Sequence, residues 1–492
     1  MLLKILRNSI FLLSGHVIAK VFSLISLIIL ARQLGVEGFG FYGRVMAYLT
    51  LFATIADAGM GTVTIRDVAQ DRSRSHRYFT QIFLLRMLLT MIGYVCLVAL
   101  GGFRQDQHYP LTFVVVCGLF LFPEAVRKLG ISLLTAYEHI HFVAVVEVLS
   151  IFLRYLPFFT AIILGQSLRT AFGLLVITWG MIAVFSLVLS QRACLLHWVR
   201  SPVNFSEFRH ILHEAYPFGI LTLLSVIYFK IDILMLAEMQ GDIAVGFYEG
   251  AYKFVEAPFF IPVSIVNVLL PVMARTFTTD QASYKNTYIH ATRILAMGIL
   301  PVVLLVSLLS RDVILLVLNE SYLPSAPALS VVIWALFWMF VNAPVGNIIA
   351  TSHSMHAFLP YAIGSVVFNI IMNAILIPRY SFFGACIATL LTEVLSFSFQ
   401  LTFAQRILGS ARQVLVLVGK ILAAGGVAAA LFYATEVWLP TLAGGLLVVG
   451  TYVVCVFLFR LVDANDRVLC RELFTLARAK LFAKSHYTES AR

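Results

Sequence analysis

The chain has 492 residues, of which 61% are hydrophobic and only 12% are charged. Because a soluble domain carries about 25% charged residues, this composition excludes an ordinary water-soluble globular protein. Apolar stretches recur at about 20 residues, the length of a membrane-spanning helix. Length and composition therefore indicate a protein that crosses a membrane many times.

Fourteen apolar segments alternate with breaks that are rich in charge, glycine or proline. The predicted spans are 9–31, 41–62, 79–100, 111–132, 141–164, 170–190, 215–237, 246–273, 289–309, 326–351, 355–377, 383–404, 414–435 and 441–461. The first of them is longer than the apolar core of a signal peptide, and no small-residue cleavage site follows it. We expect it to be retained, and we predict an all-α integral membrane protein with fourteen transmembrane helices.

Lysine and arginine gather on one side of this predicted topology. The few that fall on the outer side are Arg32, Arg104, Arg169, Arg311 and Arg379. By the positive-inside rule, both termini are then cytoplasmic. The net charge of +11 mostly records this orientation and predicts no nucleic-acid partner. We expect the basic tail at 463–492 to lie against anionic lipid headgroups as an interfacial helix.

A short sequence occurs twice, as LARQLGVEGFGFY at 30–42 and as LAEMQGDIAVGFY at 236–248. The copies follow predicted spans 1 and 7, so they are six spans apart and share one orientation, which indicates a parallel repeat. The predicted parts are an N-lobe (1–190), a basic linker (191–214), a C-lobe (215–404), a helix pair (405–462) and the tail. We expect each copy to form a tight outer turn with an interfacial tyrosine.

The six cysteines show no metal-binding spacing and are expected to be small packing residues. No CxxC or HExxH motif occurs in the sequence. We therefore predict no metal, no cofactor and no catalytic residue.

Charged residues inside the predicted spans are the strongest functional signal. A charge at the bilayer centre costs at least about 2.5–3.5 kcal/mol, so such residues call for a functional explanation. Four cations near span centres come from both repeated halves: Lys20, Arg154, Lys230 and Lys253. If they meet between the lobes, they form a cationic cavity that suits an anionic group such as a phosphate. The residues themselves thus predict a two-lobed transporter of an anionic substrate.

Some of these charges also have a structural interpretation. Glu249, Lys253 and Glu256 lie at i, i+4 and i+7, an order that favours ion pairs within the helix. Lys230 and Asp232 point about 200° apart on their helix, so one of them is expected to pair with a neighbouring helix.

Other polar residues are predicted to anchor or join helices. Near span ends, snorkelling or interface anchoring is expected for Arg44, Asp57, Arg86 and Arg293. Two predicted spans carry polar stripes that we expect to be hydrogen-bonded seams: Ser365, Asn369 and Asn373, and Thr389, Glu393, Ser396 and Gln400.

Three segments carry a family resemblance: ARQLGVEGFGFYGRVMAY, KIDILMLAEMQGDIAVGFYEGAYK and ILIPRYSFFGACIATLLTE. With the two six-helix repeats and the terminal pair, the chain resembles the Wzx-type O-antigen flippases of the polysaccharide-synthesis exporter family. That family belongs to the multidrug/oligosaccharidyl-lipid/polysaccharide exporter superfamily.

The resemblance implies a function and partners. It implies flipping of an undecaprenyl-pyrophosphate-linked oligosaccharide across the bacterial inner membrane by alternating access, in contact with membrane lipids and with polysaccharide polymerase machinery. The pyrophosphate would enter the cationic cavity, and the lipid tail would stay in the bilayer. Some relatives couple transport to protons or sodium; the candidate carriers here are Asp57, Asp232 and Glu393.

Two alternatives remain open at this point. A lipid II flippase, or another exporter of the superfamily, would have a similar architecture. A membrane enzyme of polysaccharide assembly (a polymerase, ligase or glycosyltransferase) would share the substrate, but such enzymes usually carry a large outer loop. Here the longest predicted outer loop, 310–325, is short and holds no recognisable acid/base pair. We therefore predict a transporter that is not an enzyme.

Overall fold

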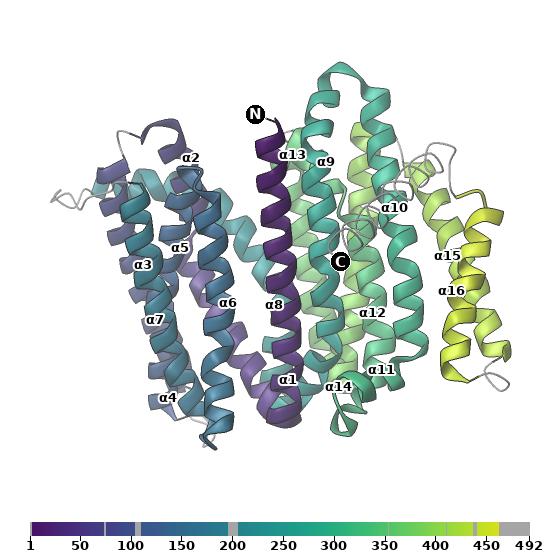
Figure 1. The fold of residues 1–492 in the computed structure, drawn as a ribbon, viewed down its shortest axis with the longest axis horizontal. Coiled ribbons are helices and arrows are strands. Elements are labelled where there is room, and N and C mark those ends of the chain that lie inside the picture. The colour runs from purple at the N-terminus through teal and green to yellow at the C-terminus, as the bar shows by residue number, and fades with distance from the viewer. Residues whose placement is uncertain are drawn as a thin grey trace, which may run out of the picture. The chain divides into compact units, whose positions relative to one another are not determined.

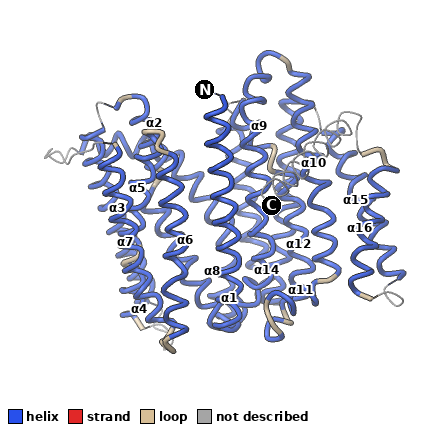
Figure 2. Tube along the Cα trace, in the orientation of Figure 1, coloured by secondary structure: helices blue, strands red, loops and turns tan. Residues whose placement is uncertain are grey.

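The computed structural model describes residues 2–72, 75–103, 110–194, 205–352, 354–409, 411–435 and 440–461. These residues form α-helices, short 3-10 helices and turns, and no strand occurs among them (Figure 2). The predicted all-α class is confirmed. The predicted tail at 463–492 and residues 195–204 of the predicted linker lie outside the described residues.

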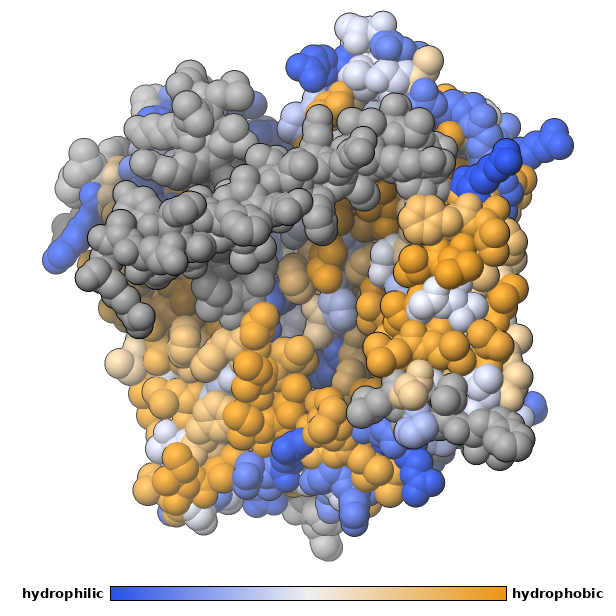
Figure 3. Space-filling model, turned by 45° about the vertical axis from the view of Figure 1, so that its right-hand side comes forward, coloured by the Kyte–Doolittle hydropathy of each residue, from blue (hydrophilic) through white to orange (hydrophobic). Residues whose placement is uncertain are grey.

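The helices have the length and surface of membrane-spanning segments. Within the described ranges, nine helices are long and apolar enough to cross a membrane. Figure 3 shows mainly hydrophobic side chains across the middle of the visible face, where residues are coloured, and hydrophilic ones toward its upper right and its lower edge. All fourteen predicted spans coincide with largely helical segments, in three cases two spans to one kinked helix. The number of crossings itself stays a prediction.

One compact unit comprises Met1–Pro258, Arg311–Val332 and His356–Leu395. Its helices are α1 (Leu2–Asp57), α2 (Met60–Gln70), α3 (Ser75–Phe103), α4 (Leu111–Gly118), α5 (Leu121–Ala136), α6 (Ile140–Ile163), α7 (Leu168–Ala193), α8 (Phe205–Glu256), most of α11 (Ser310–Val317), η3 (Glu320–Tyr322) and most of α14 (Met355–Leu408). This unit holds every residue of the candidate site described below.

The second compact unit comprises Phe259–Ser310, Ile333–Met355 and Ser396–Arg492. It contains α9 (Phe260–Thr279), which follows η2 (Ala257–Phe259), α10 (Gln281–Leu308), most of α12 (Ser325–Asn342), α13 (Val345–Thr351), α15 (Ala411–Thr435) and α16 (Thr441–Leu458). Inside it, Asn347 donates a hydrogen bond to the carbonyl of Val266 at 2.8 Å, which joins α13 to α9. The predicted lobes 1–190 and 215–404 have other boundaries than these units and stay a prediction.

Helices α1 and α8 both kink at the same position of the repeated sequence. Gly35 has φ 67° and ψ −177°, and Gly241, its counterpart 206 residues later, has φ 80° and ψ −176°. A positive φ of this kind is readily adopted only by glycine. In Figure 1, the purple ribbon of α1 descends from the N-terminus and turns back at its lower end. The repeat therefore encodes one backbone bend, made twice, at the tight turn that was predicted for each copy.

The two bends also pack directly on each other. A Cβ atom at Gly40 would lie 1.8 Å from the carbonyl oxygen of Asp242, and one at Gly246 would lie 2.0 Å from that of Val36. Gly40 aligns with Gly246, and Val36 aligns with Asp242, so each copy contacts the other through the same positions. Glycine is required here because the two backbones touch.

The interfacial role predicted for the repeated tyrosine is wrong. Tyr42 and Tyr248 are only 5% and 1% exposed. Tyr42 packs edge-on against Phe158, with ring centroids 5.0 Å apart. Tyr248 donates a hydrogen bond to Asp232 at 2.8 Å. Both rings are held inside the protein because each finds an internal partner, which sequence position at a loop did not reveal.

Candidate functional site

A cavity of about 400 Å³ lies within the Met1–Pro258 segment. Helices α1, α5, α6 and α8 line it, and its wall mixes apolar side chains with an unusual number of charges for a membrane protein. The charged residues of the wall are Lys20, Glu124, Lys128, Arg154, Lys230, Glu249, Lys253 and Glu256. Five cations thus face three carboxylates.

All four cations that the sequence singled out line this one cavity. Lys20 comes from α1, Arg154 from α6, and Lys230 and Lys253 from α8. The mutual packing of α1 and α8 at their kinks brings the two repeated sequences into one unit. The structure therefore brings these residues together, while their binding of a substrate stays a prediction.

The α8 side of the cavity is neutralised by its own carboxylates. The Lys253 ammonium lies 2.6 Å from Glu249 and 2.6 Å from Glu256, the i, i+4 and i, i+3 pairs that helical spacing favours. Lys230 lies 3.5 Å from Glu256. Glu249 is only 2% exposed, so its charge needs this lysine. The predicted ion pair between Glu249 and Lys253 is confirmed.

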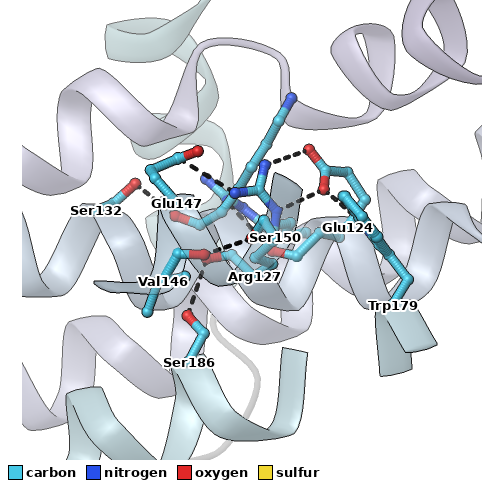
Figure 4. A network of polar contacts seen from close by, with 11 residues as sticks. Glu124, Arg127, Ser132, Val146, Glu147, Ser150, Trp179 and Ser186 are labelled. Carbon is cyan, nitrogen blue, oxygen red and sulfur yellow. Dashed lines mark hydrogen bonds and ion pairs between the residues drawn. The ribbon is translucent and has the colours of Figure 1, made fainter. Parts of the chain in front are cut away.

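A second charged network lies where α5, α6 and α7 meet (Figure 4). The Arg127 guanidinium donates two hydrogen bonds to Glu124, at 2.8 and 3.0 Å, and a third to Glu147 at 3.2 Å. The Trp179 indole donates to the same Glu124 carboxylate at 2.8 Å. Although Glu124 belongs to the cavity wall, its charge is therefore matched by Arg127.

Three cations of the wall have no such carboxylate. Within the described part of the chain, no acidic oxygen lies within 4.0 Å of Lys20, Lys128 or Arg154. The Arg154 guanidinium lies over the Trp179 ring, 5.2 Å from its centroid, and its buried Nε has no hydrogen-bond partner among the described residues. The cations of the wall that no described carboxylate contacts are thus on its α1, α5 and α6 side, where Lys128 interacts with Glu124 only at longer range.

Serine and tyrosine hydroxyls complete this side of the wall. Ser23 and Tyr155 share a hydrogen bond of 2.8 Å between α1 and α6, and both line the cavity. The buried Tyr42 also contributes to the lining. The wall therefore offers hydroxyl groups beside its free cations, and such groups bind oxyanions and sugars alike.

The arginines predicted to snorkel instead have partners inside the protein. Arg86 is 1% exposed and lies 2.9 Å from Asp57, and it also donates to the carbonyl of Ala125. Arg44 lies 3.0 Å from Asp242, and Arg293 donates to His290 at 2.6 Å. For Arg86 and Arg293, snorkelling is wrong because both are buried. An internal acceptor stabilises a buried guanidinium without access to the headgroups.

The three predicted ion carriers occupy different surroundings, and none is among the residues that line the cavity. Asp57 forms the ion pair with Arg86. Asp232 is 2% exposed and accepts hydrogen bonds from Tyr248, Thr389 and Asn373. Glu393 accepts one from Tyr228 at 2.6 Å. A role in coupling stays a prediction for all three.

The polar seams predicted on the two halves of α14 are present. Asn369 donates a hydrogen bond to Thr392 and accepts one from Asn373. Asn373 and Thr389 each donate a hydrogen bond to the Asp232 carboxylate of α8. The expected partner of Asp232 on a neighbouring helix is thus found on α14, while Lys230 lines the cavity.

Sequence reasoning missed two residues of the site. Lys128 was not among the four cations singled out from the sequence, yet it lines the cavity. Trp179 was not singled out, although it contacts both Glu124 and Arg154. The spacing of Glu124, Arg127 and Lys128 at one end of an apolar run was an available signal, since a charged cluster there needs internal partners.

The fold and the cavity define a class, that of all-helical multi-pass membrane proteins with a charged internal cavity. The chain belongs to the polysaccharide biosynthesis protein family, whose model matches residues 5–277. It is 24% identical over 301 residues to the teichuronic acid biosynthesis protein TuaB of Bacillus subtilis (strain 168), across 57% of this chain and 58% of that protein. The chain spans 58% and 61% of the two curated relatives it matches.

Solved structures of transporters share the fold. The chain is similar to the lipid II flippase MurJ in an inward closed conformation, with a TM-score of 0.76 and 13% identity over 92% of this chain and 99% of that one. It is also similar to an inward-facing multidrug resistance MATE family transporter of the MOP superfamily, with a TM-score of 0.60 and 16% identity over 80% and 96%. At these identities the likeness establishes the fold. The predicted polysaccharide-synthesis family is confirmed by the family model.

Proposed function

We propose that this protein is a flippase that moves an anionic lipid-linked oligosaccharide from the inner to the outer leaflet of the bacterial cytoplasmic membrane by alternating access. The observation that carries the proposal is the cavity, where Lys20, Lys128 and Arg154 have no carboxylate partner within the described chain. Unpaired cations in an apolar protein are costly, and an anionic substrate offsets that cost. The family and the transporter fold support the same reading.

The proposed substrate is an undecaprenyl-pyrophosphate-linked oligosaccharide, such as an O-antigen repeat unit. Its pyrophosphate would bind the predicted cations Lys20, Arg154, Lys230 and Lys253, because phosphate oxygens accept charge-assisted hydrogen bonds. Its sugars would contact the hydroxyls of the wall, and its lipid tail would stay in the bilayer. Both termini would be cytoplasmic, and polysaccharide polymerase machinery would receive the product.

Deletion followed by complementation tests this function. Deleting the gene should abolish surface polysaccharide, and the intact protein should restore it. Lys20→Ala and Arg154→Ala should restore it poorly, whereas Lys420→Ala should restore it fully. Lys420 is a matched control because it is an exposed lysine of α15 outside the cavity. Unchanged surface polysaccharide after deletion would contradict the proposal.

A lipid II flippase is the second candidate, favoured by the likeness in fold to MurJ. Lipid II also carries a pyrophosphate, so the cavity charges suit both substrates. Rescue of cells depleted of their lipid II flippase separates the two. Growth of such cells on this protein would favour lipid II, and their failure to grow, with normal rescue of surface polysaccharide, would favour the oligosaccharide.

A further inference from the structure

The charges of the cavity are divided unequally between its two sides. On the α8 side, Lys253 is held between two carboxylates and Lys230 lies near Glu256. On the opposite side, Lys20 of α1, Lys128 of α5 and Arg154 of α6 have no acidic partner within 4.0 Å in the described chain. An anion entering the cavity must displace a carboxylate on the first side and none on the second.

Arg154 shows how one of these free cations is held in place. Its guanidinium stacks over Trp179, which is fully buried, and Trp179 is itself fixed by its hydrogen bond to Glu124. Glu124 is in turn held by two hydrogen bonds from Arg127 (Figure 4). The ring therefore orients Arg154 without neutralising it, because a cation–π contact leaves the N–H donors free.

The buried Nε of Arg154 is a donor that an anion in the cavity could use. It has no hydrogen-bond partner among the described residues, although buried donors in proteins are nearly always satisfied. A phosphate oxygen that accepted from this side of the guanidinium would satisfy it, and planar bidentate recognition of phosphate is a common use of arginine.

We propose that Lys20, Lys128 and Arg154 form the subsite for the pyrophosphate group, and that Trp179 is the positioning residue that holds Arg154 there. Lys230 and Lys253 then chiefly hold the carboxylates of α8, and they contribute less to the anion. The identity of the ligand rests on the proposed function. The subsite adds Lys128 to the cations that bind the pyrophosphate and gives Lys230 and Lys253 a smaller part in that binding.

Binding of undecaprenyl pyrophosphate to the purified protein in lipid nanodiscs tests the subsite. Lys20→Gln, Lys128→Gln and Arg154→Gln should each weaken binding by about tenfold or more, the usual effect of losing a hydrogen bond to a charged group. Lys230→Gln should lose less affinity than any of these three variants. Lys420→Gln should bind the lipid as tightly as the unaltered protein does. Equal losses of affinity in Lys230→Gln and Lys128→Gln would overturn the assignment of the pyrophosphate to the α1, α5 and α6 side.

One substitution is expected to raise the affinity for undecaprenyl pyrophosphate in the same binding experiment. Glu256→Gln removes the carboxylate near Lys230 while Lys253 keeps Glu249, so the α8 side gains a free cation. We expect binding to tighten by about threefold or more, and weaker binding would contradict the account. Inorganic pyrophosphate in excess should compete with the lipid; no competition would overturn recognition through the anion.

Trp179 is tested by two substitutions that differ in the ring. Trp179→Phe keeps an aromatic face for Arg154 and loses the hydrogen bond to Glu124, whereas Trp179→Leu loses both. We expect Trp179→Phe to stay within about threefold of the unaltered affinity and Trp179→Leu to lose about tenfold. The loss should vanish when Arg154 is already glutamine, since the indole acts through that residue. Additive losses would assign Trp179 a merely structural role.

The failures of the two proposals are distinguishable. If deletion of the gene leaves surface polysaccharide unchanged but the order of binding losses holds, the proposed function fails and the subsite stands. If the protein moves the lipid but the variants bind it equally, the subsite alone fails. Thermal unfolding of every variant identifies those that have lost their fold.

Discussion

Lys253 is held at the cavity wall by two glutamates of its own helix, α8. Glu249 is almost fully buried, and its charge is compensated through the 2.6 Å contact with Lys253. Removing one partner of a buried ion pair leaves an uncompensated charge, whereas removing both does not. The pair is therefore expected to be structurally important apart from any contact with substrate.

We predict that Lys253→Ala destabilises the protein by about 3–5 kcal/mol. The double variant Glu249→Ala/Lys253→Ala should lose less than the sum of the single losses, by about 1–3 kcal/mol. Unfolding in detergent micelles measures both. Additive losses would mean that the two charges do not interact in the folded protein.

Asp57 and Asp232 differ in the charge of their partners. Asp57 lies against the Arg86 guanidinium, while the donors to Asp232 are hydroxyl and amide groups. A carboxylate among neutral donors can exchange a proton or a cation more easily than one that is paired to an arginine.

We therefore predict that Asp232→Asn removes the dependence of transport on a proton or sodium gradient. Asp57→Asn should keep that dependence and should instead lower stability, because Arg86 is left buried. Transport by reconstituted protein with and without each gradient is the measurement. Retained coupling in Asp232→Asn would eliminate this carboxylate as a carrier.

At the residue scale, the sequence predicted which charges are costly but not what each one contacts. The midspan positions of Lys20, Arg154, Lys230 and Lys253 were enough to place them at one site. The contact between Arg154 and Trp179 joins residues on different helices, and helical spacing holds no information on such pairs. The i, i+4 pair of Glu249 and Lys253 was predictable because it is local.

Glycines determine how closely α1 and α8 approach each other. Gly40 lies in helix, where its Cβ would clash with the carbonyl of Asp242, while Gly180 of α7 has open space around the corresponding position. The two glycines thus separate the effect of a close backbone contact from that of helix propensity.

Gly40→Ala is predicted to destabilise the protein by about 3 kcal/mol, because one backbone must move. The matched control Gly180→Ala should be neutral or stabilising by about 0.5–1 kcal/mol, since alanine favours helix. Thermal unfolding of the two variants compares them directly. Equal stability would mean that α1 and α8 do not approach closely at this position.

At the element scale, the sequence predicted the helices well and their junctions less well. The repeats at 30–42 and 236–248 were predicted to form tight turns with interfacial tyrosines; the turns are present, as kinks at Gly35 and Gly241, but the tyrosines are buried. An apolar pattern gives the length of a span, while continuity across a glycine depends on what packs against it. Here the second copy of the repeat is that packing partner.

The topology of the whole chain is a separate prediction. Single cysteines on a cysteine-free background should react with a membrane-impermeant maleimide from outside at Arg311→Cys and only after permeabilisation at Arg209→Cys. Both positions lie in described segments outside the predicted spans. Labelling of Arg209→Cys in intact cells would contradict the orientation that the positive-inside rule gives.

At the scale of the whole molecule, composition and charge alternation were enough for the all-helical membrane class. The division into compact units was not accessible in the same way. Unit boundaries cut through α14 and leave α8 with the first unit, because they follow which backbone segments lie close together and not the sequence repeats. A repeat in the sequence shows common local structure, here the paired kinks, but does not fix which helices pack together.

Movement of a fluorescent undecaprenyl-pyrophosphate-linked oligosaccharide across the bilayer of proteoliposomes tests the central claim most directly. The account predicts transfer between leaflets by the intact protein, with at least about a tenfold loss in Lys128→Gln and Arg154→Gln and none in Lys420→Gln. Transfer no faster than in protein-free liposomes, with folded protein and with either gradient imposed, would contradict it.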